Sequence, residues 1–176
     1  AMQQRMGRFI LGHRGNSSIE AIKGESGWWS MGERRDRLRM NFCGKIVGVG
    51  KERNVRRMYD EMREEDDGWA KEMRCTMQRW YLEEDWKRNS ITDYSGWERK
   101  VKRKMEEKIE EAWKRRSESN SKLKMMRKVK DKRNKSGLLK SDFRSAAKLL
   151  MQIRSGTSEL RIDRGRFENL ERKERI

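Results

Sequence analysis

The chain has 176 residues, enough for one domain or two small ones, and its 46 Lys and Arg against 29 Asp and Glu give a formal net charge of +17. Hydrophobic residues make up only 33%, so we expect a thin core in which seven Trp and 12 Met supply much of the buried area. No run of 18 apolar residues occurs, which argues against a membrane-spanning helix, and the two cysteines have no CxxC partner, which favours reduced thiols in the nucleus or cytoplasm.

Helical spacing of apolar residues begins at the start of the chain. The first predicted helix ends at Gly12, and its apolar residues are Met2, Met6, Phe9 and Ile10. Ser17 with Glu20 forms a capping-box pattern, in which a hydroxyl and a carboxylate three residues later bond to free backbone N–H groups at a helix start. A short second helix is therefore expected to follow Ser17.

A second capping-box pattern, Ser30 with Glu33, predicts the next helix, which ends at the glycines of residues 48–50. Its apolar face carries Leu38, Phe42 and Ile46. The next stripe, behind a possible cap at Asn54, consists of Val55, Met58, Tyr59 and Met62. A further helix follows the acidic run 64–67 and carries Trp69, Met73, Met77, Trp80 and Tyr81.

The longest predicted helix lies behind a third capping-box pattern, Ser95 with Glu98, and its aligned apolar residues are Trp97, Val101, Met105, Ile109, Ala112 and Trp113. A break at 117–121 and a basic segment at 122–135 follow. The last clear helix, capped by Asp142, carries Phe143, Ala146, Ala147, Leu150 and Ile153. The sequence thus predicts an all-α fold, an irregular bundle of about six to eight helices, divided into an N-terminal region 1–96 and a basic region 97–176.

Catalytic and metal-binding patterns are weak. Gly48-Val49-Gly50-Lys51 resembles a phosphate loop, but the first glycine and the final Ser or Thr of that motif are replaced by Lys45 and Glu52. Adjacent carboxylates at 64–67 lack the spaced oxygen ligands of a designed cation site, and one His with two distant Cys cannot make a zinc site. We therefore predict no catalytic residue, no metal ligand and no cofactor.

Positive charge is concentrated in residues 97–135, where 17 Lys and Arg face seven Asp and Glu. Basic residues before 117 have acidic neighbours at helical spacing, so that part can be a solvated, self-paired helix face. The later basic residues have almost no local acids, and we expect them to contact phosphates. The predicted nucleic-acid contacts are Lys122, Lys124, Arg127, Lys128, Lys130, Lys132 and Arg133, with Arg154, Arg161 and Arg166 as secondary contacts.

Two end motifs are similar to those of a known family. The tail Arg154-Ser155-Gly156-Thr157 continues through Leu160 and Ile162 to Gly165-Arg166-Phe167, and it resembles R-S-G-T-x-x-L-x-I-x-x-G-R-[FW] in non-LTR retrotransposon open reading frames. Near the start, Arg8-Phe9-Ile10-Leu11-Gly12 and Glu25-Ser26-Gly27-Trp28 resemble the R-F-[IV]-L-G … E-L-G-W signature of the same family. The order of the motifs extends the resemblance over essentially the whole chain.

The resemblance implies a region that follows the polymerase domain of a reverse transcriptase and holds template RNA or target DNA. The family's aromatic-x-Asp-Asp motif and its Cys/His knuckle both lie outside this sequence, so no polymerase metal residue is carried over, and the chain is expected to be inactive alone. Expected partners are nucleic acid and the remainder of the polymerase chain, with no membrane and no small-molecule substrate. The alternative is a structural or protein-interaction bundle whose charged faces pair with one another.

Overall fold

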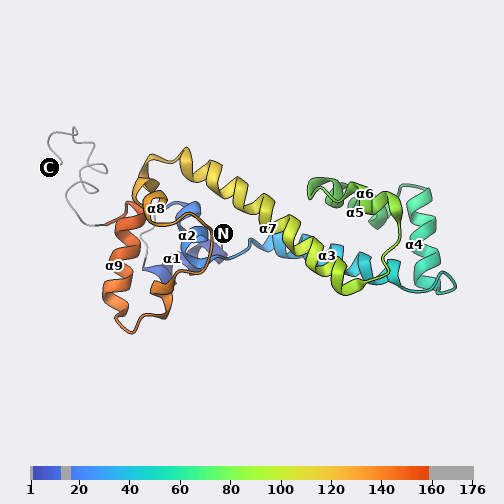
Figure 1. Cartoon of the computed structure of the whole chain (residues 1–176), viewed down its shortest axis with the longest axis horizontal. Coiled ribbons are helices and arrows are strands. Elements are labelled where there is room, and N and C mark those ends of the chain that lie inside the picture. The colour runs from blue at the N-terminus through green and yellow to red at the C-terminus, as the bar shows by residue number, and fades with distance from the viewer. Residues whose placement is uncertain (1, 13–16, 159–176) are drawn as a thin grey trace. The chain divides into compact units, whose positions relative to one another are not determined.

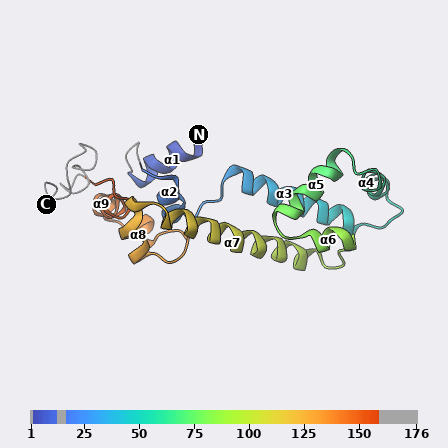
Figure 2. The ribbon, with the colours of Figure 1, turned by 90° about the horizontal axis from the view of Figure 1, so that it is seen from above.

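The computed structural model describes residues 2–12 and 17–158, and these residues form nine α-helices and two short 3₁₀ helices with no β-strand among them (Figures 1 and 2). The predicted all-α class is confirmed. In these two ranges no helix combines the length and the apolar composition that crossing a membrane requires.

The chain divides into two compact units. Unit 1 consists of Ala1–Trp29 together with Glu110–Ile176, and unit 2 is the continuous segment Ser30–Ile109. The boundaries of these units differ from those of the expected regions 1–96 and 97–176, because unit 1 combines the two ends of the chain. Each unit is described below by itself.

Unit 2 contains α3 (Met31–Gly48), α4 (Asn54–Glu64), α5 (Gly68–Arg79), α6 (Glu83–Arg88) and the first part of α7 (Tyr94–Glu118). Helix α5 packs against α3, α4 and α6. The indole N–H of Trp97 in α7 donates to the carbonyl of Met40 in α3 at 3.0 Å. Its ring lies directly against Gly44, where a Cβ would come within 2.3 Å of the indole. The missing side chain at Gly44 therefore allows this close approach.

Unit 1 contains α1 (Met2–Leu11), α2 (Ile19–Ser26), the end of α7, η1 (Ser121–Leu123), α8 (Lys124–Val129), η2 (Gly137–Lys140) and α9 (Arg144–Ser155). Its core has two buried clusters. One consists of Ala21, Trp113, Leu123 and Met126. The other consists of Leu11, Ile22 and Met151, with Leu138 and Leu139 partly buried beside it. Both clusters draw residues from the two ends of the sequence, so neither end can form this core alone.

Helix-start signals predicted some boundaries correctly. The Ser30 hydroxyl accepts from the Glu33 N–H at 3.2 Å and the Glu33 carboxylate accepts from the Ser30 N–H at 2.6 Å, which confirms that capping box. The cap of α2 is Ser18, not Ser17. The third box was wrong, because α7 begins at Tyr94 and so contains Ser95. Asp142 was also wrong as a cap, since α9 follows Phe143 with no side-chain cap.

The apolar stripe of α7 is confirmed, since Trp97, Val101, Met105, Ile109 and Trp113 are all at most 5% exposed. The stripe of α5 is also largely confirmed, because Met73, Met77 and Trp80 are buried. The stripe of α1 was wrong as a core face, and those of α3, α4 and α9 were only partly right. The exposed members of the predicted stripes are Met2, Met6, Phe9, Ile10, Leu38, Phe42, Val55, Met58, Met62, Tyr81, Phe143 and Leu150. The core of unit 2 also contains Met40 and Cys43, which no predicted stripe includes.

Gly27 is a point where the two ends of unit 1 meet. It ends α2 in the left-handed conformation, with φ of 66°, and its N–H bonds to the Lys23 carbonyl. A Cβ at this position would lie 2.7 Å from the Lys135 nitrogen and 3.0 Å from the Asn134 carbonyl carbon. Only glycine combines this backbone angle with such close passage of another backbone segment.

Candidate nucleic-acid interface

Positive charge is divided unevenly between the two units. The described residues of unit 1 carry 18 Lys and Arg against seven Asp and Glu, an excess of 11, whereas unit 2 carries 21 against 17, an excess of four. A polyanion is attracted by the net excess of positive charge rather than by the number of basic residues. Unit 1 is therefore the candidate interface.

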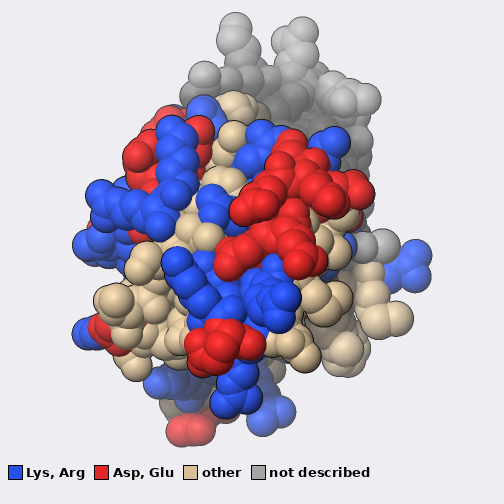
Figure 3. All heavy atoms as spheres, turned by 90° about the vertical axis from the view of Figure 1, so that its right-hand side faces the viewer, with Lys and Arg blue, Asp and Glu red and all other residues tan. Residues whose placement is uncertain are grey.

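Unit 2 neutralises much of its own charge. Arg56 donates to Asp60 at 2.8 Å, and Arg74 donates to Asp66 at 2.6 Å. Lys87 pairs with Glu83 and Glu84. Figure 3 looks at the side where α4 and α6 lie, and Lys and Arg side chains are interspersed there with Asp and Glu. Such a mixed surface attracts a phosphate strand weakly, because each cation lies close to a carboxylate.

Two of the predicted contacts, Lys130 and Arg154, meet at a buried carboxylate. Glu25 is fully buried. Its Oε1 atom lies 3.4 Å from the Arg154 guanidinium, and its Oε2 atom lies 3.8 Å from the Lys130 ammonium. Burial lowers the pKa of Lys130 below its usual value, and the neighbouring Glu25 carboxylate opposes that shift. These two cations connect α2 with the segment after α8 and with α9, so they stabilise the unit from inside.

Arg127 and Arg133 also have partners within unit 1. The Arg127 guanidinium donates to the carbonyls of Ser117, Glu118 and Asn120 at 2.5–3.0 Å, at the C-terminal end of α7. A cation there is favoured by the helix dipole and satisfies carbonyls that have no helical partner. Arg133 donates from its guanidinium to the Trp28 carbonyl at 2.6 Å and from its backbone N–H to Glu110 at 3.1 Å.

Three predicted contacts remain at the surface. The side chains of Lys124, Lys128 and Lys132 are exposed, and none of them has a carboxylate within 4.0 Å among the described residues. Lys122 is half-buried and has contacts within the protein. Arg161 and Arg166 lie outside the described residues. The structure thus separates the predicted set into cations used in folding and cations presented to solvent, and phosphate contact by the latter stays a prediction.

Sequence reasoning missed several exposed basic residues of the same unit. Within the described residues, the following have no ion-pair partner: Lys114, Arg115, Lys135, Lys140, Arg144 and Lys148. Arg115 has acidic neighbours at helical spacing, but Glu111 and Glu118 are both exposed and neither forms an ion pair with it. The signal that could have found these residues is the net charge of the spatial unit, which the linear sequence hides because unit 1 is discontinuous.

Two carboxylates of the acidic run 64–67 bond to neighbouring groups of unit 2. Asp66 pairs with Arg74, and the Asp67 carboxylate accepts from the Gly68 N–H at 2.6 Å at the start of α5. No group of three or more His, Cys, Asp or Glu in the described ranges is placed to hold a metal ion.

Comparison with family models, with curated proteins and with solved structures finds no match to this chain.

Proposed function

We propose that unit 1 binds single- or double-stranded nucleic acid through its phosphates, with Lys124, Lys128 and Lys132 as the central contacts. The observation that carries this proposal is the excess of 11 positive charges in the described part of unit 1, in contrast to four in unit 2. Binding to phosphates releases condensed counterions, and a Kd of roughly 10⁻⁴–10⁻⁶ M at physiological salt is expected for contacts that do not read the sequence.

We further propose that the chain is a segment of a non-LTR retrotransposon reverse transcriptase from downstream of the polymerase centre. Besides the motifs themselves, one contact supports this assignment. Glu25, from the motif near the start, pairs with Arg154, the first residue of the motif near the end, although 129 residues separate them. Two motifs that carry one resemblance thus contribute to one ion pair, in which the carboxylate is fully buried.

Within that larger protein, the proposed role of this segment is to hold template RNA or target DNA without taking part in the chemistry. The resemblance supplies no catalytic carboxylates here, so every proposed contribution of this chain is to binding.

The test is the salt dependence of binding to a fluorescent 20-nucleotide strand, measured by anisotropy for the full chain. The variant K124Q/K128Q/K132Q should reduce the slope of log K against log salt by about one unit per lost phosphate contact. The matched control K51Q/R57Q/K71Q removes the same charge from exposed unit 2 residues that have no ion-pair partner among the described residues. It should leave the slope almost unchanged. Equal slopes for both variants would contradict the assignment to unit 1.

The second candidate function is a structural or protein-interaction bundle, and the self-paired surface of unit 2 favours it. The two functions separate on a heparin column. Retention to high salt supports polyanion binding, whereas elution near the void volume supports the structural bundle.

A further inference from the structure

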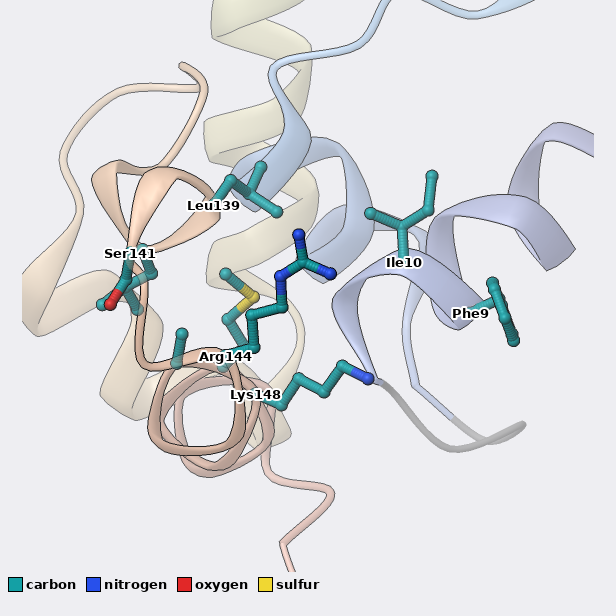
Figure 4. A pocket seen from close by; sticks show the side chains of 9 residues that line it. Phe9, Ile10, Leu139, Ser141, Arg144 and Lys148 are labelled. Atoms are coloured by element: carbon teal, nitrogen blue, oxygen red, sulfur yellow. The ribbon is translucent and has the colours of Figure 1, made fainter.

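A groove in unit 1 lies between α1, η2 and α9 and has a volume of about 440 Å³ (Figure 4). Ligand sites typically have volumes of about 300–1,000 Å³. The floor of the groove is apolar, because Ala147 and Met151 of α9 are buried there and Leu138 and Leu139 of η2 are half-buried. Met151 also belongs to the buried cluster with Leu11 and Ile22, so the floor is part of the core and is formed before any ligand arrives.

One wall of the groove is cationic. Arg144 and Lys148 stand one turn apart on α9, and no Asp or Glu of the described residues lines the groove. Figure 4 shows the Arg144 guanidinium between Leu139 and Ile10, and the Lys148 side chain extended toward α1. Neither cation has a carboxylate partner among the described residues. Both are therefore available to an anionic group in the groove.

The position of Lys148 is fixed by the turn that ends α1. Gly12 has φ of 64°, and a Cβ there would lie 2.8 Å from the Lys148 Cγ and Cδ atoms. The Gln152 side chain, one turn further along α9, donates to the Gly12 carbonyl at 2.6 Å. The methylene stem of Lys148 thus packs on the backbone of Gly12, while its ammonium remains exposed, an arrangement common for long basic side chains.

The opposite edge of the groove carries apolar side chains in contact with solvent. Phe9 is 82% exposed and Ile10 is 43% exposed, although both line the groove. An exposed aromatic ring at the edge of a groove can stack on a nucleic-acid base, because every base offers a flat π-face. The groove thus combines an apolar surface that suits a base with a cationic wall that suits a nearby phosphate.

We propose that this groove holds one unpaired nucleotide of a single-stranded nucleic acid, with the base against Phe9 and Ile10 and a flanking phosphate on Arg144 and Lys148. The inference rests on the proposed function and narrows its substrate class. In a duplex the base faces are stacked on their neighbours and cannot enter the groove, so its apolar part contributes to single-strand binding alone.

The experiment compares binding of the full chain to a 12-nucleotide single strand and to the duplex of the same sequence, by fluorescence anisotropy. Phe9→Ala should weaken single-strand binding by about tenfold, within the range seen when one stacking side chain is removed, and should leave duplex binding almost unchanged. Phe143→Ala is the matched control, because Phe143 is 79% exposed in the same unit and does not line the groove. Both phenylalanines are exposed, so neither substitution removes core packing.

A second pair of variants tests the cationic wall. R144Q/K148Q should lower the ratio of single-strand to duplex affinity by about fivefold or more, whereas K114Q/K140Q, which removes the same charge from outside the groove, should leave that ratio unchanged. Equal effects of the groove and control variants would overturn the inference and leave polyanion binding by unit 1 standing. Failure of the unmodified chain to bind either oligonucleotide would overturn both.

Discussion

At the scale of single residues, burial decides which side chains can react. Cys43 lies in the interior of unit 2, and its Sγ is 3.4 Å from the Tyr59 hydroxyl. Removal from water raises the pKa of Cys43 to about 11, although the Tyr59 hydrogen bond and the Arg63 and Arg56 charges oppose the shift. Burial also raises the pKa of Tyr59. The thiol is therefore neutral at physiological pH and acts as a small apolar group.

Thiol labelling tests this prediction. At pH 8, about three units below its pKa, Cys43 has roughly one thiolate per thousand molecules, and the thiolate is the reactive form. Iodoacetamide should therefore modify one thiol of the native chain, the exposed Cys75, and two thiols in denaturant. Raising the pH toward 11 should speed Cys43 labelling, because deprotonation increases through the raised pKa. Labelling of native Cys75→Ser at the rate seen in denaturant would show that Cys43 is accessible.

At the scale of helices, small residues determine which faces meet. In α1, Gly7 and Leu11 are buried, and a Cβ on Gly7 would lie 2.5 Å from the Ile22 side chain of α2. In α3, Gly44 instead leaves room for the indole ring of Trp97, which reaches across from α7. Close approach of two helices gives many van der Waals contacts, which compensates for the smaller apolar area of glycine. Unit 1 and unit 2 thus both use a glycine to make room at a contact between two helices.

The same point explains which predictions from sequence succeeded. The stripe of α7 was predictable because its Trp, Val, Met and Ile residues are both the largest apolar residues and the buried ones. The buried faces of α1 and α3 were not predictable in this way. Hydrophobic periodicity identifies the largest apolar side chains, whereas these two helices contact their neighbours at Gly7 and Gly44. The basic segment was recognisable from composition, but the engagement of Lys130 and Arg154 by Glu25 depends on a contact over more than 100 residues, which local spacing cannot predict.

Substitution of Gly27 tests how much such a close contact contributes to stability. Gly27→Ala should destabilise the chain by at least about 2 kcal/mol, because an L side chain is strained at positive φ and the new Cβ would meet the backbone of residues 134 and 135. Urea denaturation followed by far-UV circular dichroism measures the change. Gly137→Ala is the control, since nothing lies within 4 Å of a Cβ there, and it should shift stability by less than about 0.5 kcal/mol. Equal shifts for both variants would show that Gly27 is not a tight contact.

At the scale of the whole molecule, the two units differ in charge and are expected to respond differently to a polyanion. Hydrogen–deuterium exchange, with and without a saturating single-stranded oligonucleotide, measures the amide exchange rates of both units in one experiment. Amides in 110–158 should exchange more slowly in the complex, because bound ligand suppresses local opening of the unit it contacts. Amides in 30–109 should change little, and they serve as the internal control. Protection centred on 30–109 would place the interface in unit 2.

The discontinuity of unit 1 has a consequence for how the protein is made. Unit 2 is encoded without interruption in residues 30–109, so it can fold as soon as that stretch leaves the ribosome, while Glu25 must wait for Arg154. At roughly 5–20 residues per second, that wait is of the order of ten seconds. During this interval Leu11, Ile22 and Ala21 have no core to join. The apolar side chains of α1 and α2 therefore stay open to unwanted contacts until the later part of unit 1 has been made.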